Sequence, residues 1–372
     1  MANLKVNTVS GIGTEGPVLD GGLHFRSKNY LTLPKGTTTE RTATSSGIST
    51  ETGSIRYNTD SNKMECYIGD KWMIVAVSSP NLDGGGRGMA AGGNTPGQSD
   101  VIEYITISTA GNSIDFGNLT AARQSTPAGT GSLTRGVIGG GQVFPARVNT
   151  VDFITFSSTG NATDLCDLTV TRGQISAASN QTRGVFGGGQ SPSTVDTIDF
   201  ITIASTANAV DFGNLTVARR MAEAASSPTR ALFVGGLTPS NSDVIDFITI
   251  GTTGNAQDFG DITVAKYSVG TVSSPTRAVM MGGVTGSNVS TIEYVNIATR
   301  GNAMNFGALT ETIANAQCVS DSIRAVRMGG VTPLDNSMDY IKISTEGNAV
   351  DFGDLLSVHK EGAGLSNAHG GL

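Results

Sequence analysis

The sequence has few of the residues from which disulfide frameworks and metal sites are built. Its 372 residues include three cysteines and three histidines. An odd number of widely separated cysteines fits neither a disulfide framework nor a paired-thiol metal site, and the histidines lack the close spacing that zinc ligands favour. We therefore expect unpaired thiols, no metal and no cofactor. The residues concerned are Cys66, Cys166, Cys318, His24, His359 and His369.

Long apolar runs and an excess of positive charge are also missing. The longest unbroken apolar run, Trp72 to Val77, falls far short of the roughly 20 residues that a membrane span needs. Residues Met1 to Lys5 open no signal-peptide core. The net charge of -7 argues against a surface that neutralises nucleic-acid phosphates. We expect a protein that is made in a cytoplasm, spans no membrane and binds no nucleic acid.

The 50 glycines indicate many tight turns, and most of the chain is a repeat. The run Ile245 to Ile250, followed by Gly254 to Gly260, occurs six times with small changes. Its acidic residue recurs every 46 to 49 residues. A period of this length, with several strand patterns in each unit, is typical of a propeller blade. The six acidic positions are Glu103, Asp152, Asp199, Asp246, Glu293 and Asp339.

Each unit contains four short strand patterns, which is the number in a propeller blade. In the unit from Leu215 to Ile262, a first strand of small residues precedes Thr229 to Gly236, which ends in a glycine pair. The glycine pair and the aromatic residues of the third and fourth strands resemble the kelch repeat over roughly residues 86 to 369. Phenylalanine or leucine stands where kelch blades usually carry tryptophan. The third-strand residues are Tyr104, Phe153, Phe200, Phe247, Tyr294 and Tyr340, and the fourth-strand residues are Phe116, Leu165, Phe212, Phe259, Phe306 and Phe352.

Counting the strands predicts how the repeats close. No first strand precedes Arg87, because Gly84 to Gly86 stand directly before it, whereas a spare first strand remains around Gly362 to Ser366. We expect this spare strand to pair with the segment after Gly86 and so to remove exposed sheet edges. The expected fold is all-β: a six-bladed kelch-like β-propeller at residues 83–372, closed by the C-terminal strand.

Residues 1–82 contain no copy of the repeat. Strand patterns at Ser54 to Tyr57 and Lys63 to Ile68 flank a turn-rich stretch, and Gly69-Asp70 leads into a third strand. Together they predict a small β-meander. Three short strands bury little surface, so we expect this module to pack on the propeller or on copies of itself.

Part of this module resembles a segment of bacteriophage tail-fibre and other virion structural proteins. The resemblance is carried by Leu31 to Gly36, Gly53 to Asp60 and Tyr67 to Trp72, in which Ile-Arg-Tyr-Asn-Thr-Asp is the most specific run. It implies a virion component that is located in the virus particle and contacts other virion proteins through residues 1–82.

Two series of basic residues recur in the units. The first could form a cationic ring that binds an acidic sugar or a phosphate, but we favour a structural role in which each arginine pairs with a carboxylate such as Asp152 or Asp246. The second series, Arg123, Arg172, Arg219 and Lys266, is interrupted at Ile313 and His359, so a local pocket is open there. The first series is Arg87, Arg135, Arg183, Arg230, Arg277 and Arg324.

No catalytic residues are expected. Asp115, Asp164, Asp211, Asp258 and Asp351 recur once per unit, whereas a catalytic pair of carboxylates is a unique site. Glycine runs such as Gly139 to Gly141 precede no helix pattern and no Lys-Ser/Thr, so they do not form a phosphate-binding loop.

The loops between the second and third strands vary from unit to unit, and we expect all six on one face. Loops on a rigid scaffold often carry binding specificity, and their polar groups suit sugar hydroxyls. The alternative is that they are solvated turns without a ligand. The candidate ligand-binding residues are Gln98, Gln142, Phe144, Arg147, Gln190, Asn241, Asn288 and Asn336.

These observations favour a non-enzymatic phage virion protein, such as a tail fibre or a related appendage. We expect it to attach to the host surface by binding a glycan, with assembly of several copies through residues 1–82 multiplying weak sites. Two alternatives stay open. One is a capsid-decorating or neck and tail component that contacts only virion proteins, and the other is a glycan-processing enzyme on a propeller scaffold.

Overall fold

A computed structural model describes residues 33–42, 52–61, 63–74, 86–331 and 333–372. The chain divides into two compact units, Met1–Ser79 and Pro80–Leu372. The expected boundary after residue 82 lies outside the described residues. Strands dominate the described residues, so the all-β prediction is confirmed, and the helix found among these residues is a single 3₁₀ turn at Thr39–Thr42. A search of the described residues found no helix suited to crossing a membrane.

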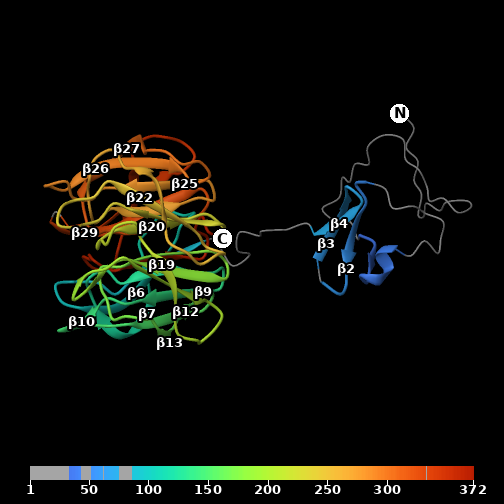
Figure 1. Ribbon diagram of the computed structural model, residues 1–372, viewed down its shortest axis with the longest axis horizontal. Coiled ribbons are helices and arrows are strands. Elements are labelled where there is room, and N and C mark those ends of the chain that lie inside the picture. The colour runs from blue at the N-terminus through green and yellow to red at the C-terminus, as the bar shows by residue number, and fades with distance from the viewer. Residues whose placement is uncertain (1–32, 43–51, 62, 75–85, 332) are drawn as a thin grey trace, which may run out of the picture. The chain divides into compact units, whose positions relative to one another are not determined.

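The first unit contains one small sheet in the order β1-β2-β3-β4 (Figure 1). The predicted meander is present in β2, β3 and β4, which pair as consecutive antiparallel strands. Gly69 and Asp70 join β3 to β4 with φ values of 55° and 62°, as a two-residue hairpin turn of matching twist requires. Strand β1, parallel to β2, was not predicted. The strands are β1 (Lys35–Gly36), β2 (Ile55–Asn58), β3 (Lys63–Ile68) and β4 (Lys71–Ile74).

The second unit contains six antiparallel four-stranded sheets over residues 86–331 and 333–372. We number the sheets in chain order and their strands from first to fourth. Two short hairpins, β10–β11 (Gln142–Val143 and Ala146–Arg147) and β16–β17 (Gln190–Ser191 and Ser193–Thr194), lie between second and third strands. The first sheet contains β32 (Ala363–Ser366), β5 (Arg87–Ala91), β6 (Ser99–Thr106) and β7 (Ile114–Arg123), and the second contains β8 (Ala128–Gly131), β9 (Arg135–Gly139), β12 (Thr150–Thr155) and β13 (Thr163–Asp167). The third sheet contains β14 (Ser176–Ser179), β15 (Arg183–Gly187), β18 (Thr197–Thr202) and β19 (Val210–Asn214), and the fourth contains β20 (Glu223–Ser226), β21 (Arg230–Val234), β22 (Val244–Thr249) and β23 (Gln257–Asp261). The fifth sheet contains β24 (Gly270–Ser273), β25 (Arg277–Met281), β26 (Val289–Asn296) and β27 (Met304–Ile313), and the sixth contains β28 (Gln317–Ser320), β29 (Arg324–Val331), β30 (Leu334–Lys342) and β31 (Val350–Asp354).

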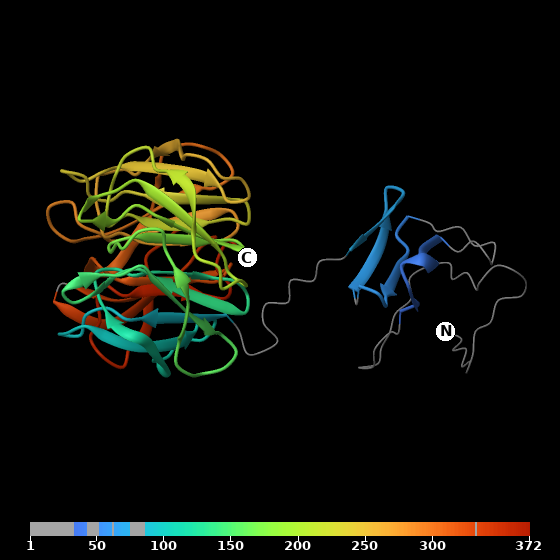
Figure 2. The same cartoon turned by 60° about the horizontal axis from the view of Figure 1, so that its bottom comes forward.

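The first sheet takes its first strand from the C-terminal end of the chain. Strand β32 pairs antiparallel with β5, with Leu365 opposite Met89, and the strand pairing predicted from the sequence is therefore confirmed. Figure 2 shows the last strands of the chain, in red, beside the first strands of this unit, in cyan. Leu365 and Met89 are both buried. Residues 276 positions apart thus share one core.

The six first strands contact one another in a cycle that runs β8, β14, β20, β24, β28, β32 and back to β8. A non-glycine residue with φ between 47° and 62° precedes each of these strands. Their backbone groups form a closed ring of hydrogen bonds, which we call the left-handed ring. The N–H donors and carbonyl acceptors are Gln174 to Ser125, Met221 to Gln174, Ser268 to Met221, Asn315 to Ser268, Glu361 to Asn315 and Thr126 to Glu361.

A second chain of hydrogen bonds joins the other ends of the first strands. The last residue of five of them is a serine whose hydroxyl donates to a backbone carbonyl of the preceding sheet. We call this the serine chain. Gly131 occupies the position in β8, so the chain has no hydroxyl at that point. The serines are Ser179, Ser226, Ser273, Ser320 and Ser366.

The acidic residue that marks the repeat fastens each sheet to the one before it. Asp199 accepts hydrogen bonds from the backbone and hydroxyl of the exposed Thr169 and forms an ion pair at 2.8 Å with Arg172, and both charged side chains of this pair are fully buried. Asp152, Asp246 and Glu293 form the same buried pairs with the second basic series. That series therefore forms joints between sheets and not a pocket.

The two interruptions of that series are handled differently. Where Ile313 replaces the cation, Arg327 of β29 pairs with Asp339 directly opposite it, at 2.7 Å. Where His359 replaces it, the imidazole contacts the Gly92 carbonyl. Glu103 at this junction accepts instead from Ser113 and from the Leu356 backbone.

Within the part of the chain that the structure describes, the first arginine series pairs with no carboxylate, so that part of the interpretation was wrong. Each guanidinium stacks on the third-strand aromatic ring of its own sheet, 4.3 to 5.1 Å from the ring centroid. It also donates to a backbone carbonyl of the next sheet, and Arg324 of the sixth sheet reaches Ser108 of the first. Asp152 and Asp246 form ion pairs with Arg123 and Arg219, respectively. All six arginines, Arg87, Arg135, Arg183, Arg230, Arg277 and Arg324, thus join sheets to one another.

We predict that Asp199→Asn lowers the free energy of unfolding by about 3 to 5 kcal/mol, because it leaves the buried Arg172 charge without its counter-ion. The matched control is Glu103→Gln, at the equivalent position of a junction without a buried cation, where we expect a loss of about 1 to 2 kcal/mol. Denaturant unfolding measures both. Equal losses would show that the ion pair adds nothing to the joint.

Candidate functional site

Seven of the eight predicted ligand-binding residues lie on the segments between second and third strands, which we call the loop face, and Asn336 lies within the third strand β30. Three of them hold one another. Gln98 of the first sheet donates to the Gln142 carbonyl of the second at 2.7 Å, and its own side-chain oxygen accepts from the Phe144 backbone at 3.0 Å. Phe144 itself, at the tip of the β10–β11 hairpin, has 71% of its surface exposed. An aromatic ring is therefore displayed on a backbone that neighbouring loops restrain.

The same network continues to the third sheet. Arg147 donates to the Gln190 side-chain oxygen at 2.8 Å. Arg220, which sequence reasoning did not select, donates to the Gln174 side-chain oxygen at 2.9 Å and approaches Gln190 at 3.5 Å. The structure therefore brings together Gln98, Gln142, Phe144, Arg147 and Gln190 in one sector, formed by the first three sheets.

The three predicted asparagines lie outside that sector. The Asn241 amide donates to the Val284 carbonyl of the next sheet at 3.3 Å, and the Asn288 amide does so to the Val331 carbonyl. The Asn336 amide donates to the Leu355 carbonyl of its own sheet at 3.3 Å. These three amides donate to backbone carbonyls of the scaffold. The polar groups available to a ligand therefore differ from sheet to sheet.

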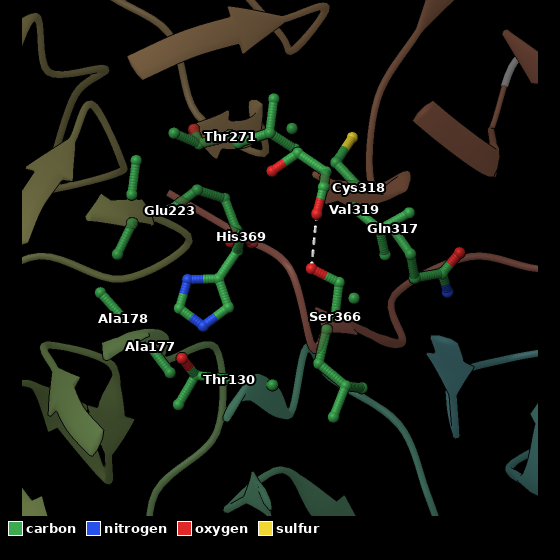
Figure 3. A pocket seen from close by; sticks show the side chains of 18 of the residues that line it. Thr130, Ala177, Ala178, Glu223, Thr271, Gln317, Cys318, Val319, Ser366 and His369 are labelled. Atoms are coloured by element: carbon green, nitrogen blue, oxygen red, sulfur yellow. Dashed lines mark hydrogen bonds between the residues drawn. The ribbon is translucent and has the colours of Figure 1, made fainter. Parts of the chain in front are cut away.

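A second candidate site is a cavity of about 70 Å³ enclosed by the six first strands. Figure 3 shows the His369 imidazole among side chains from these strands, including Glu223, Thr271 and Cys318. Sequence reasoning missed Glu223 because its equivalents in other sheets are residues such as Ala128 and Gly270, so no repeated signal marks it. The cavity has room for a few water molecules.

His369 lies beside the end of β8, where Gly131 stands in place of a serine. Its Nε2 atom lies 3.0 Å from the Gly131 carbonyl and 3.1 Å from the Ser179 hydroxyl, while its Nδ1 atom accepts from the Gly371 backbone. This pattern requires the proton on Nε2. Burial lowers the pKa of His369 to about 4. The ring is therefore neutral at pH 7 and reinforces the link that the Ser179 hydroxyl already makes to the Gly131 carbonyl.

Glu223 faces the cavity without a hydrogen-bond partner among the described residues. Loss of solvent raises its pKa to about 8. Burial, with a further contribution from the Glu223 carboxylate, raises the pKa of the Cys318 thiol. Near neutral pH the cavity thus holds a protonated carboxyl, a protonated thiol and a neutral imidazole.

We predict that stability falls between about pH 6.5 and 8 because of Glu223. In this range the unfolded state has released the Glu223 proton and the folded state retains it, while His369 is neutral in the folded state and loses its remaining charge in the unfolded state as pH rises above 6.5, which offsets a small part of the fall. The free energy of unfolding should drop by about 1 to 2 kcal/mol as pH rises, given roughly 1.4 kcal/mol per proton and pH unit. Denaturant unfolding of Glu223→Gln should give a flat profile, and Asp115→Asn, which removes an exposed carboxylate, should keep the wild-type slope. An unchanged slope in Glu223→Gln would contradict the assignment.

Comparison with known proteins adds no family. No model of a protein family matches this sequence, and no curated protein is significantly similar to it.

Proposed function

We propose that residues 83–372 form a six-bladed kelch-like β-propeller that acts as a binding scaffold. Three features support it: six antiparallel sheets of four strands, the cyclic contact of their first strands, and a first sheet completed by the C-terminal strand. A radial arrangement of this kind leaves only short, protected edges. It also places equivalent loops of every sheet at one end.

The protein, in this proposal, is a non-enzymatic component of a phage virion, a tail fibre or a related appendage. The support is the resemblance of residues 33–36, 53–60 and 67–72 to tail-fibre segments, together with their separate sheet β1-β2-β3-β4. Leu31 and Thr32, which also carry the resemblance, lie outside the described residues. This module attaches to other virion proteins and to copies of itself, so that several propellers are displayed together and weak sites act jointly.

The ligand of the loop face is a host surface glycan. One observation carries this assignment: the exposed Phe144 ring on a hairpin that Gln98 ties to the neighbouring sheet. A flat apolar ring flanked by amides and a guanidinium matches the apolar faces and hydroxyls of sugars. Because the backbone is restrained before binding, less conformational entropy is lost on binding.

The enzyme alternative would place glycan cleavage in the central cavity. Glycosidic hydrolysis commonly uses two carboxylates, whereas Glu223 is the one acidic side chain among the described residues that line it. A volume of about 70 Å³ also falls well below the roughly 300 to 1,000 Å³ of sites for organic ligands. The virion-only alternative predicts a loop face that is covered in the particle.

The test is binding of the purified full-length protein to a panel of bacterial surface polysaccharides, with release of reducing ends measured in parallel. We expect binding without cleavage, and about tenfold weaker binding by Phe144→Ala, a loss of about 1.4 kcal/mol. The matched control, Leu133→Ala, removes an exposed apolar side chain from the same sheet at the opposite end of β9 and should bind normally. Cleavage would favour the enzyme, and absence of binding to every polysaccharide would contradict glycan attachment.

A further inference from the structure

Two arginines of the loop face lack an acidic partner. Among the described residues, Arg147 and Arg220 form no ion pair, and the oxygens that accept from them belong to the uncharged amides of Gln190 and Gln174. The buried cations Arg123, Arg172, Arg219 and Lys266 differ, since each has a carboxylate within 3.0 Å. The positive charge of this sector is therefore not neutralised by the protein.

One oxygen atom brings the two guanidinium groups close together. Gln190 Oε1 lies 2.8 Å from Arg147 Nη2 and 3.5 Å from Arg220 Nη1. Two guanidinium groups that approach the same oxygen atom repel each other, and the uncharged amide of Gln190 offsets only part of that repulsion. A guanidinium has five N–H donors, and a single nitrogen of each group is engaged here. Several donors of both groups thus remain for an anion.

Both arginines also depart from the repeat. Arg220 follows the cation of the second basic series, and the other five sheets carry a different residue at that position. Arg147 belongs to the β10–β11 hairpin, which has the Phe144–Pro145 tip that no other sheet carries. The charged residues that recur from sheet to sheet hold neighbouring sheets together. A residue that occurs in one sheet alone is not needed for that role and can contact a ligand. The equivalents of Arg220 are Gln124, Gly173, Tyr267, Ala314 and Lys360.

We propose that Arg147 and Arg220 form an anion-binding site for the carboxylate or phosphate group of a surface glycan, with Phe144 as the neighbouring apolar contact. The planar guanidinium matches the geometry of both anions and can bind either through two parallel hydrogen bonds. Two cations on a protein of net charge -7 are too few to follow a nucleic-acid backbone. The glycan part of this inference rests on the proposed function, whereas the anion site itself does not.

The experiment uses the full-length protein and the variants Arg147→Gln, Arg220→Gln and the double variant. The probes are an oligogalacturonate, a mannose-6-phosphate oligosaccharide and a neutral mannan oligosaccharide. Arg300→Gln is the matched control: this exposed arginine also donates to a glutamine side-chain oxygen, that of Gln257, and lies over the Phe247 ring, away from the loop face. It removes the same charge.

We expect the wild type to prefer an acidic probe, with affinity falling about tenfold for each single variant and about a hundredfold for the double variant. Raised salt should weaken this binding, and Arg300→Gln should bind like the wild type. Whichever acidic probe is preferred identifies carboxylate or phosphate as the natural group. A double variant that still binds acidic probes like the wild type would overturn the site.

The remaining outcomes separate the two proposals. Equal wild-type affinity for neutral and acidic probes would overturn the anion site and leave glycan attachment standing. If no glycan binds, thermal unfolding in inorganic phosphate decides: a rise in Tm for the wild type and Arg300→Gln, but not for the double variant, would keep the anion site and contradict glycan attachment. No rise in any protein would overturn both.

Discussion

The closed left-handed ring is the constraint on which the second unit depends. Its residues adopt a backbone conformation that costs non-glycine residues about 1 kcal/mol or more each. They are held there because the N–H before each first strand donates to a carbonyl of the equivalent turn of the preceding sheet, all the way round the ring. The serine chain repeats this logic at the other end of the first strands, where His369 also contacts the Gly131 carbonyl and the Ser179 hydroxyl. With both ends tied, each sheet is fixed by two neighbours, and the buried acids need only complete the joints farther out.

Much of this architecture could be predicted from the sequence because it repeats. The period, the four strands and the role of the C-terminal strand follow from counting patterns, and β32 pairs where it was expected. The partner of each charge could not be predicted. From the sequence alone, Arg135 and Arg172 could each pair with a carboxylate. The strand register decides between them: it places Arg135 over the Phe153 ring and Arg172 beside Asp199. The left-handed ring could not be predicted either, because residues such as Met221 and Gln174 are not of the types that favour a positive φ.

The candidate site illustrates the opposite case. A repeat identifies scaffold residues, and ligand contacts are the positions at which it fails. Sequence reasoning selected Phe144 and Arg147 because they lie in a loop that varies between units, and for the same reason it selected Asn241 and Asn288, whose amides join sheets. Arg220 was overlooked because it adjoins Arg219, which belongs to the joints. Arg219 is buried against Asp246, whereas the adjacent Arg220 lies on the loop face. The sequence does not distinguish these two positions, and the three-dimensional structure does.

The most direct test of the account is native-state hydrogen exchange of the full chain, because every conclusion depends on the C-terminal strand belonging to the first sheet. Amides open to exchange according to the free energy of the unit that holds them. We predict that the peptide covering residues 361–372 exchanges as slowly as peptides from β14 and β20, and together with residues 87–91. Exchange of residues 361–372 within seconds, while β14 and β20 stay protected, would contradict the closed cycle of six sheets.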